Sequence, residues 1–97
     1  MRLRYTLPAL ADLTSILDYI SNRSPQGAAW VHARIKTITE LILQHPRAGV
    51  LSDDPSIRRM TTTPYPYLIF YEVTDDEIII HAVRHGARDP SGNPGSA

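Results

Sequence analysis

The sequence contains no cysteine among its 97 residues. This absence excludes disulfide bonds, thiolate metal sites and a cysteine nucleophile together. A chain without cysteine also fits a reducing compartment. We therefore expect a cytoplasmic protein.

Long hydrophobic runs are absent as well. The longest apolar stretches fall far short of the roughly 20 residues that a membrane-spanning helix needs. The N-terminal segment MRLRYTLPAL lacks the hydrophobic region of a secretory signal peptide. The sequence therefore predicts neither membrane association nor export.

An excess of charge of either sign is also missing, because ten acidic residues balance ten basic ones. Residues 1–51 carry six basic and three acidic side chains, whereas residues 52–77 carry two basic and six acidic ones. A protein held on nucleic-acid phosphates needs several unopposed cations, so we expect no direct DNA binding. Nine of the ten cations are arginine, a residue suited to planar, bidentate contacts such as those with another protein.

What is present is the pattern of one small domain with two helices. The segment RLRY at residues 2–5 predicts a short strand, and Thr6 is a suitable N-cap for a helix that ends near SNRSP. A Ser-Pro pair at 24–25 predicts the start of a second helix, which a His-Pro pair at 45–46 ends. Apolar residues at helical spacing give each helix one hydrophobic stripe. The stripes are Leu10, Leu13, Ile16, Leu17 and Ile20 in the first helix, and Ala28, Val31, Ile35, Ile38 and Ile42 in the second.

Three further strands are predicted in the second half of the chain, at residues 57–62, 67–73 and 77–85. Residues 47–56 are interpreted as a loop because they are rich in Gly, Pro, Ser and Asp. A Tyr-Pro pair at 65–66 is expected to break the chain before the next strand. The fold class is therefore α+β: an N-terminal strand and an antiparallel helical hairpin packed on a three- or four-stranded, mainly antiparallel sheet.

The two central strands are apolar on both faces. Residues 68–70 and 78–80 are consecutive apolar residues, although a strand with one wet face should alternate with polar side chains. The helices cover only one face of the sheet. A partner chain over the outer face would explain the pattern, and the alternative is a curled sheet that buries part of both faces within the chain.

No familiar catalytic motif accompanies this fold. The chain lacks a Gly-x-Ser-x-Gly elbow, a phosphate-binding loop and a dinucleotide-binding glycine turn. His81 and His85 are four residues apart, but on a strand that spacing separates their Cα atoms by roughly 13 Å. The acidic run at 75–77 is interpreted as a turn. We expect no metal site and no cofactor.

The remaining candidates for chemistry are cationic or imidazole side chains of the later strands, namely Arg58, Arg59, His81, Arg84, His85 and Arg88. If they converge, arginine would bind phosphate and histidine would move a proton, which suffices for RNA cleavage without a metal. The alternative is that His81 is an ordinary strand histidine and that the arginines form surface ion pairs. Those pairs would join Arg58 or Arg59 to Asp53 or Asp54, and Arg88 to Asp89 or Glu72.

The order of these elements resembles the RelE/ParE family of bacterial toxins from type II toxin–antitoxin systems. The resemblance rests on LADLTSILDYI (10–20), YPYLIFYEV (65–73) and DDEIIIHAVRHGARDP (75–90). It implies one RelE/ParE-like toxin domain over residues 1–90, in a cytoplasmic bacterial protein. It also implies an antitoxin whose disordered C-terminal segment folds along the toxin in a hetero-oligomer. The low-complexity segment at 91–97 is expected to be a flexible tail.

The family contains two activities on one scaffold, and the fold does not choose between them. RelE-like members cleave mRNA on the ribosome with basic residues and a Tyr or His near the C-terminus, whereas ParE-like members poison DNA gyrase. This chain has one lysine, no tyrosine after Tyr71 and no net charge, and its HGARD segment resembles the ParE branch. We therefore expect growth inhibition through binding of DNA gyrase. The alternatives are a ribosome-dependent mRNA endoribonuclease and a non-toxic relic that only binds an antitoxin.

Each of these functions implies its own site residues. Target binding is expected where the chain leaves the last strand, at Arg84, His85 and Arg88, with no catalytic residue. In the nuclease alternative the catalytic residues are Arg58, Arg59, Arg84 and His85. The antitoxin is expected to cover the outer sheet face and the groove beside the helical hairpin, at Trp30, Leu68, Phe70 and Ile79.

Overall fold

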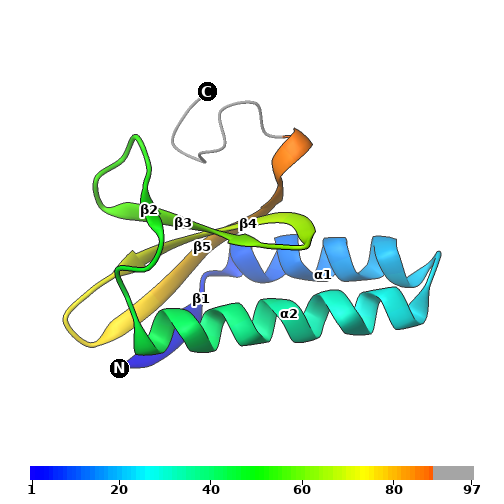
Figure 1. Ribbon diagram of the computed structural model, residues 1–97, viewed down its shortest axis with the longest axis horizontal. Coiled ribbons are helices and arrows are strands. Elements are labelled where there is room, and N and C mark those ends of the chain that lie inside the picture. The colour runs from blue at the N-terminus through cyan, green and yellow to red at the C-terminus, as the bar shows by residue number, and fades with distance from the viewer. Residues whose placement is uncertain (89–97) are drawn as a thin grey trace.

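A computed structural model describes residues 1–88 of the chain, so the expected flexible tail lies outside the described residues. The elements are β1 (Arg2–Tyr5), α1 (Leu7–Ser21), α2 (Pro25–Gln44), β2 (Val50–Leu51), β3 (Ile57–Thr62), β4 (Tyr65–Val73), β5 (Glu77–His85) and a short 3-10 helix, η1 (Gly86–Arg88). Figure 1 shows α1 and α2 running side by side along one face of the sheet. The predicted α+β architecture of a helical hairpin on a mainly antiparallel sheet is confirmed.

Both helices begin at the predicted caps. The Thr6 hydroxyl accepts the backbone N–H of Ala9 at 3.2 Å, and the Ser24 hydroxyl accepts that of Gly27 at 3.0 Å. Each bond satisfies one of the backbone donors that a helix N-terminus leaves without a partner. The second helix ends at Gln44 with His45 as its C-cap, so the His-Pro pair ends it as predicted. Within the described residues, neither helix combines the length and the apolar character needed to cross a membrane.

The sheet has five strands in the order β1-β5-β4-β3-β2, with β1 parallel to β5 and the other neighbours antiparallel. The prediction of three or four strands missed β2, which lies inside the predicted loop at 47–56. This strand consists only of Val50 and Leu51, which pair with Arg59 and Arg58. Two residues are too few to show the alternation by which a strand is recognised in a sequence.

Strand β4 begins at Tyr65 rather than at the predicted residue 67. Pro66 was expected to exclude this segment from the sheet, because proline has no N–H to donate. The β3–β4 register shifts between Thr61 and Thr62, and Pro66 has no register partner in β3 or β5. The missing donor therefore breaks no regular ladder bond.

The main core lies between the helices and the inner face of the sheet. The second helix buries most of its predicted stripe, namely Val31, Ile35, Ile38 and Ile42. The sheet contributes Tyr67, Ile69, Tyr71, Ile78, Ile80 and Val83. In α1, Ala9 is fully buried whereas Leu10 is 45% exposed. The prediction that Leu10 begins the buried stripe was therefore wrong, and Ala9 takes that place. The small Ala9 faces the core, and Leu10 is turned about 100° away from it around the helix.

Asp12 connects α1 to the last strand. Its Oδ2 accepts the backbone N–H of Val83 at 3.1 Å. The last β1–β5 register pair joins Tyr5 to Ile80, so Val83 lies beyond the end of the neighbouring strand. The carboxylate thus satisfies a part-buried backbone donor of β5 where no strand is available to accept it.

Replacing Asp12 with alanine is expected to lower the free energy of unfolding by about 1–3 kcal/mol, because the Val83 N–H loses its acceptor. The Asp12→Asn variant keeps an acceptor oxygen and should lose less. Asp18→Ala is the matched control, since Asp18 is an exposed aspartate of the same helix. Urea unfolding followed by circular dichroism measures all three variants. Equal losses for Asp12→Ala and Asp18→Ala would contradict the proposed link.

Candidate functional site

The sheet has an inner face against the helices and an outer face, because alternate residues of a strand point in opposite directions. On β4, Ile69 and Tyr71 belong to the helix-facing core, whereas Leu68 and Phe70 point away from it. The register between strands then assigns the neighbouring side chains to one face or the other.

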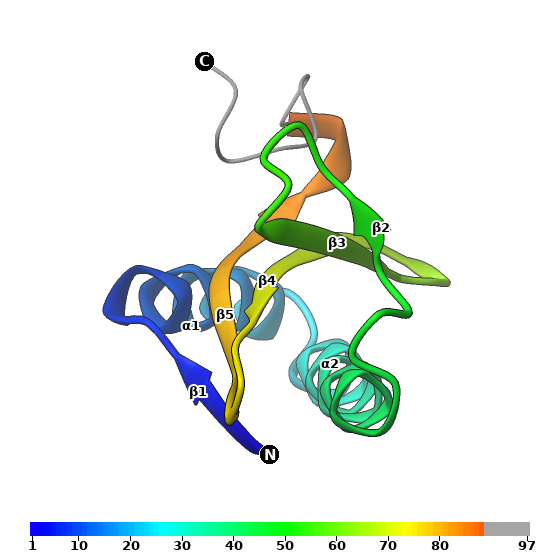
Figure 2. The same cartoon turned by 90° about the vertical axis from the view of Figure 1, so that its left-hand side faces the viewer.

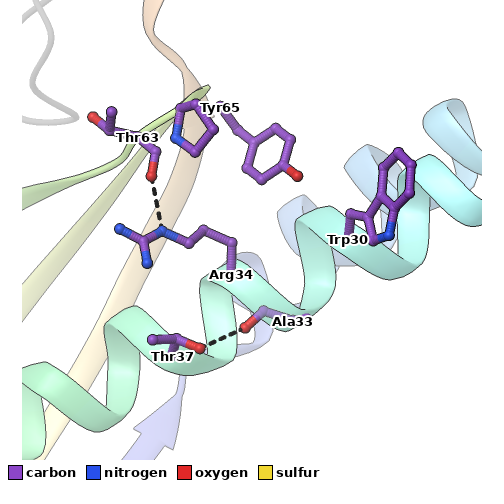
Figure 3. A pocket seen from close by; sticks show the side chains of 7 residues that line it. Trp30, Ala33, Arg34, Thr37, Thr63 and Tyr65 are labelled. Carbon is purple, nitrogen blue, oxygen red and sulfur yellow. Dashed lines mark hydrogen bonds between the residues drawn. The ribbon is translucent and has the colours of Figure 1, made fainter.

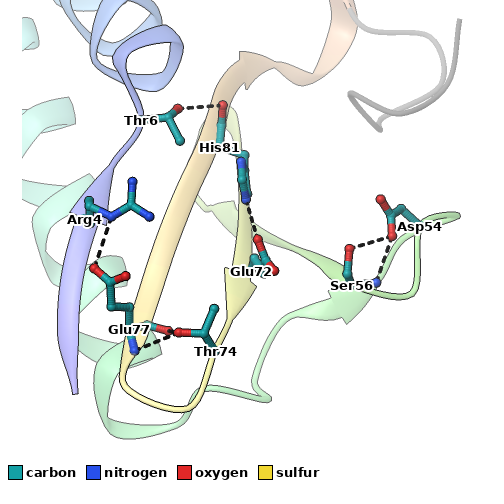
Figure 4. A network of polar contacts seen from close by, with 8 residues as sticks. All are labelled: Arg4, Thr6, Asp54, Ser56, Glu72, Thr74, Glu77 and His81. Carbon is teal, nitrogen blue, oxygen red and sulfur yellow. Dashed lines mark hydrogen bonds and ion pairs between the residues drawn. The ribbon is translucent and has the colours of Figure 1, made fainter.

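A network of polar contacts lies on the outer face near the β4–β5 turn, as Figure 4 shows. The Nε2 atom of His81 lies 2.8 Å from Glu72 Oε1, and both side chains are about one-third exposed. The Nε–H of Arg4 donates to Glu77 Oε2 at 3.1 Å. Because each of these contacts involves a carboxylate, this end of the outer face is poorly suited to binding a polyanion. These contacts fit the alternative interpretation of His81 as an ordinary strand histidine without a catalytic role.

The four residues proposed for a nuclease site do not come together. Arg59 and Arg84 have register partners on the outer face of β4, whereas Arg58 and His85 have partners on its inner face. The sheet therefore separates the two pairs. In addition, an Nη1 donor of Arg58 binds the carbonyl of Gly49 at 2.8 Å, so part of this guanidinium holds a loop.

Among the described residues, no three His, Cys, Asp or Glu side chains lie close enough together to hold a metal ion. The two histidines that the sequence places four residues apart have different surroundings. His81 contacts Glu72 on the outer face, and His85 contacts the ring of Tyr67 on the inner side.

The loop between β2 and β3 is held by its own residues. Asp54 accepts hydrogen bonds from the Ser56 backbone N–H at 2.9 Å and from its hydroxyl at 2.7 Å (Figure 4). These bonds lower the pKa of the Asp54 carboxyl. Within the described part of the chain, no ion pair forms between Asp54 and Arg58, so that one of the alternative pairings is absent.

Tyr71 fixes the loop between α2 and β2. Its buried hydroxyl donates to the Pro46 carbonyl at 2.8 Å and accepts the Gly49 N–H at 2.8 Å. Burial raises the pKa of Tyr71, although the Gly49 bond and the positive charge of Arg58 act in the opposite direction. The hydroxyl is therefore neutral at physiological pH and serves as donor and acceptor at once. Sequence analysis missed this role, because the two partners lie far from Tyr71 in the chain.

A hollow of about 500 Å³ opens between α2 and the β3–β4 connection (Figure 3). This Trp30 hollow is lined by Trp30, Ala33, Arg34, Thr37, Thr63, Pro64 and Tyr65. Trp30 is 56% exposed and thus points outward, as a contact with a partner protein requires. The Nε–H of Arg34 donates to the Thr63 carbonyl at 2.8 Å and ties the connection to the helix. An exposed tryptophan beside a polar rim is typical of a protein-binding surface.

The other three candidate antitoxin contacts lie on the outer sheet face, away from Trp30. Phe70 is fully buried, Ile79 is 8% exposed and Leu68 is half-buried. The chain therefore buries most of this apolar surface by itself, as the alternative of a curled sheet predicts. Figure 2 shows the twist that turns β2 and β3 across β4 and β5.

A second hollow, of about 420 Å³, lies between α1 and the ends of β4 and β5. This Tyr67 hollow is lined by Ser15, Ile16, Tyr19, Tyr67 and His85. Of the predicted target-binding residues, His85 belongs to it and Arg84 is exposed on the opposite face. The side chain of Arg88 lies outside the described part of the structure. Sequence analysis missed the three α1 residues, because only the tertiary fold brings that helix to the end of the last strand.

Known proteins are similar to this chain in sequence. The family described as "ParE toxin of type II toxin-antitoxin system, parDE" has a model that matches residues 3–90. Toxin RelE2 of Caulobacter vibrioides is 39% identical over 84 residues, which are 87% of this chain and 93% of that protein. Putative toxin Y4kP of Sinorhizobium fredii is 35% identical over 79 residues, which are 81% of this chain and 82% of that protein.

A solved structure is also similar. A chain of the chromosomal ParDE TA system from P. aeruginosa has a TM-score of 0.78 and 27% sequence identity, covering 88% of this chain and 95% of that one. Sequence and architecture therefore agree with the resemblance seen in the residue motifs. This chain belongs to the ParE toxin family of type II toxin–antitoxin systems.

Proposed function

We propose that this protein is a cytoplasmic toxin that inhibits growth by binding DNA gyrase and that a cognate antitoxin silences it. We favour gyrase over RNA as the target because the sheet separates Arg59 and Arg84 from Arg58 and His85. Metal-free RNA cleavage needs cations and a proton-transferring group around one phosphate. A site divided between two faces does not supply that arrangement.

The charge of the protein supports the same choice. Its net charge is zero, and the carboxylates of Glu72 and Glu77 lie at one end of the outer face. Binding to ribosomal RNA gains its affinity from unopposed cations. A protein target can instead be recognised by a few aromatic and arginine side chains.

Two reactions run in parallel test this function. The purified full-length chain is added to a gyrase supercoiling reaction and to ribosomes that carry mRNA. We expect supercoiling to be inhibited or cleaved DNA to be trapped, with the mRNA intact, and the cognate antitoxin to reverse the effect. Cleavage of mRNA in the ribosomal A site with unaffected gyrase would establish the nuclease instead. A relic that only binds an antitoxin would cause no growth arrest when expressed.

The antitoxin is proposed to dock through a disordered C-terminal segment that folds on the toxin, forming a hetero-oligomer. Trp30 is the proposed anchor, because its exposed ring stands beside the Trp30 hollow. Leu68 offers half-buried apolar area on the outer face, next to the more deeply buried Phe70 and Ile79. These outer-face contacts remain part of the proposal, with a smaller share of the binding free energy.

Replacing Trp30 with alanine is expected to weaken antitoxin binding by about 2 kcal/mol or more, a factor of roughly 30 in Kd, as for a tryptophan anchor. The free energy of unfolding should change by less than about 0.5 kcal/mol, since the side chain is largely exposed. Leu41→Ala is the matched control, because Leu41 is a 39% exposed residue of the same helix. Isothermal titration calorimetry measures the affinities. Equal affinities for the two variants would remove Trp30 from the interface.

A further inference from the structure

Three aromatic rings from three different elements surround the Tyr67 hollow. They are those of Tyr19 on α1, Tyr67 on β4 and His85 on β5. Tyr67 and His85 are register partners, and their ring centroids lie 5.5 Å apart with the planes at 88°. This edge-to-face contact is a favourable aromatic geometry, so each ring helps to hold the other in place.

The His85 ring is also fixed by a hydrogen bond. Its Nδ1 accepts the backbone N–H of Ala87 at 3.1 Å. In the neutral ring the proton is therefore on Nε2, which is a hydrogen-bond donor. The turn that begins after β5 thus sets both the orientation and the tautomer of the imidazole.

Tyr19 is held from the other side of the hollow. The guanidinium carbon of Arg23 lies 4.2 Å from the centroid of the Tyr19 ring, a cation–π contact that restrains a side chain that is 49% exposed. Ser15 lies one helical turn before Tyr19 and brings a hydroxyl to the lining, and Ile16 brings an aliphatic surface. The hollow is thus formed before any ligand arrives, which reduces the entropic cost of binding.

We propose that the Tyr67 hollow receives an aromatic side chain of the target protein. This proposal rests on the proposed function, because it assumes that the toxin acts by binding a protein. Aromatic walls bury the faces of such a ring, and the Ser15 hydroxyl and His85 Nε2–H can bond the polar atom of a tyrosine or tryptophan. The lining contains no carboxylate, and Arg23 beside it favours a partner whose aromatic residue is followed or preceded by an acidic one.

A nucleobase is less well matched to this site. A base would bring its phosphates with it, and their binding requires several unopposed cations. The lining residues include neither lysine nor arginine, and the chain as a whole has no net positive charge. The hollow therefore favours a protein ligand and lies apart from the Trp30 hollow proposed for the antitoxin.

The test is an NMR titration of the isotope-labelled full-length chain with N-acetyl-L-tryptophanamide, followed by the ring signals of His85 and Tyr67. We expect saturable shifts of both rings in the wild type. They should be lost in Ser15→Trp, whose own indole fills the hollow. Thr14→Trp is the matched control, because Thr14 is the preceding exposed residue of α1 and is absent from the lining. It should retain the shifts.

Three results of the titration would overturn the proposal: no saturable shift in the wild type, equal shifts in Ser15→Trp, or saturation by AMP but not by the tryptophan amide. Expression in cells provides the second readout. Ser15→Trp should lose growth arrest and keep wild-type affinity for the antitoxin, whereas Thr14→Trp should keep both. If the wild type itself caused no arrest, the proposed function would fail while the titration still decided whether the hollow binds an aromatic ring.

Discussion

Replacing Phe70 with alanine is expected to lower the free energy of unfolding by about 3–5 kcal/mol in the isolated chain. The side chain is fully buried on the face of the sheet that the helices do not cover. Truncation removes most of its apolar surface and leaves a cavity that a close-packed interior fills only in part. A domain of this size has a total stability of about 5–15 kcal/mol, so the variant should unfold at a much lower urea concentration.

The Leu68→Ala variant is the matched control for this measurement. Leu68 lies on the same strand and the same face but is only half-buried, so its loss should be less than half as large. Urea unfolding without any partner is the decisive condition. A loss below about 1 kcal/mol for Phe70→Ala would contradict burial of the ring within this chain.

The run of apolar residues at 68–70 predicts burial on both faces of β4, and both faces are indeed buried. The pattern does not tell what covers the outer face, because the covering depends on the twist of strands that are distant in the sequence. A partner chain and a curled sheet give the same local pattern.

The helices were predictable for the opposite reason, since their signals are local. Thr6 and Ser24 each accept a hydrogen bond from a residue three positions later, so the cap and its partner lie within one short segment of sequence. The apolar spacing of α2 likewise gave its buried stripe. Leu10 was misplaced because a stripe read from hydrophobicity alone favours leucine over the smaller Ala9, which fits against the core.

The sequence also indicates that the candidate nuclease residues lie on two different faces of the sheet. Arg58 and Arg59 are adjacent on one strand, and so are Arg84 and His85. Adjacent residues of a strand point to opposite faces, so all four were never able to share one site on a flat sheet. The Tyr67 hollow had no such signal, because it depends on the position of α1 over the ends of β4 and β5.

Replacing Gly49 with alanine is expected to cost about 3 kcal/mol of unfolding free energy, through overpacking and a lost hydrogen bond. A Cβ atom at this position would lie 2.6 Å from the Tyr71 hydroxyl oxygen and 2.8 Å from the Arg59 carbonyl oxygen. The carbonyl belongs to a strand and cannot swing aside, so the loop itself must move. Gly86→Ala is the matched control, because its nearest neighbour would be 3.5 Å away. Similar losses for both variants would show that the close approach at Gly49 is unimportant.

Replacing Tyr71 with phenylalanine removes the hydroxyl that accepts the Gly49 N–H. We expect a loss of about 1–3 kcal/mol, because the buried Gly49 N–H is left without an acceptor. Tyr65→Phe is the control, since Tyr65 is half-buried and packs against the same core. Burial raises the pKa of Tyr71, so its hydroxyl contributes fully below its unfolded pKa of about 10 and less as the pH rises further. Tyr71→Phe should therefore reduce the alkaline loss of stability that the wild type shows.

The double variant decides whether the two residues act as one unit. If the hydroxyl stabilises the protein mainly through Gly49 and the loop that it holds, Gly49→Ala already breaks that contact, and adding Tyr71→Phe should cost little more. The measured loss should then fall short of the sum of the single losses by about 1 kcal/mol or more. Phenylalanine also removes the atom that lies 2.6 Å from the added Cβ, which increases the shortfall. Strictly additive losses would mean that Tyr71 stabilises the fold through Pro46 and core packing, independently of Gly49.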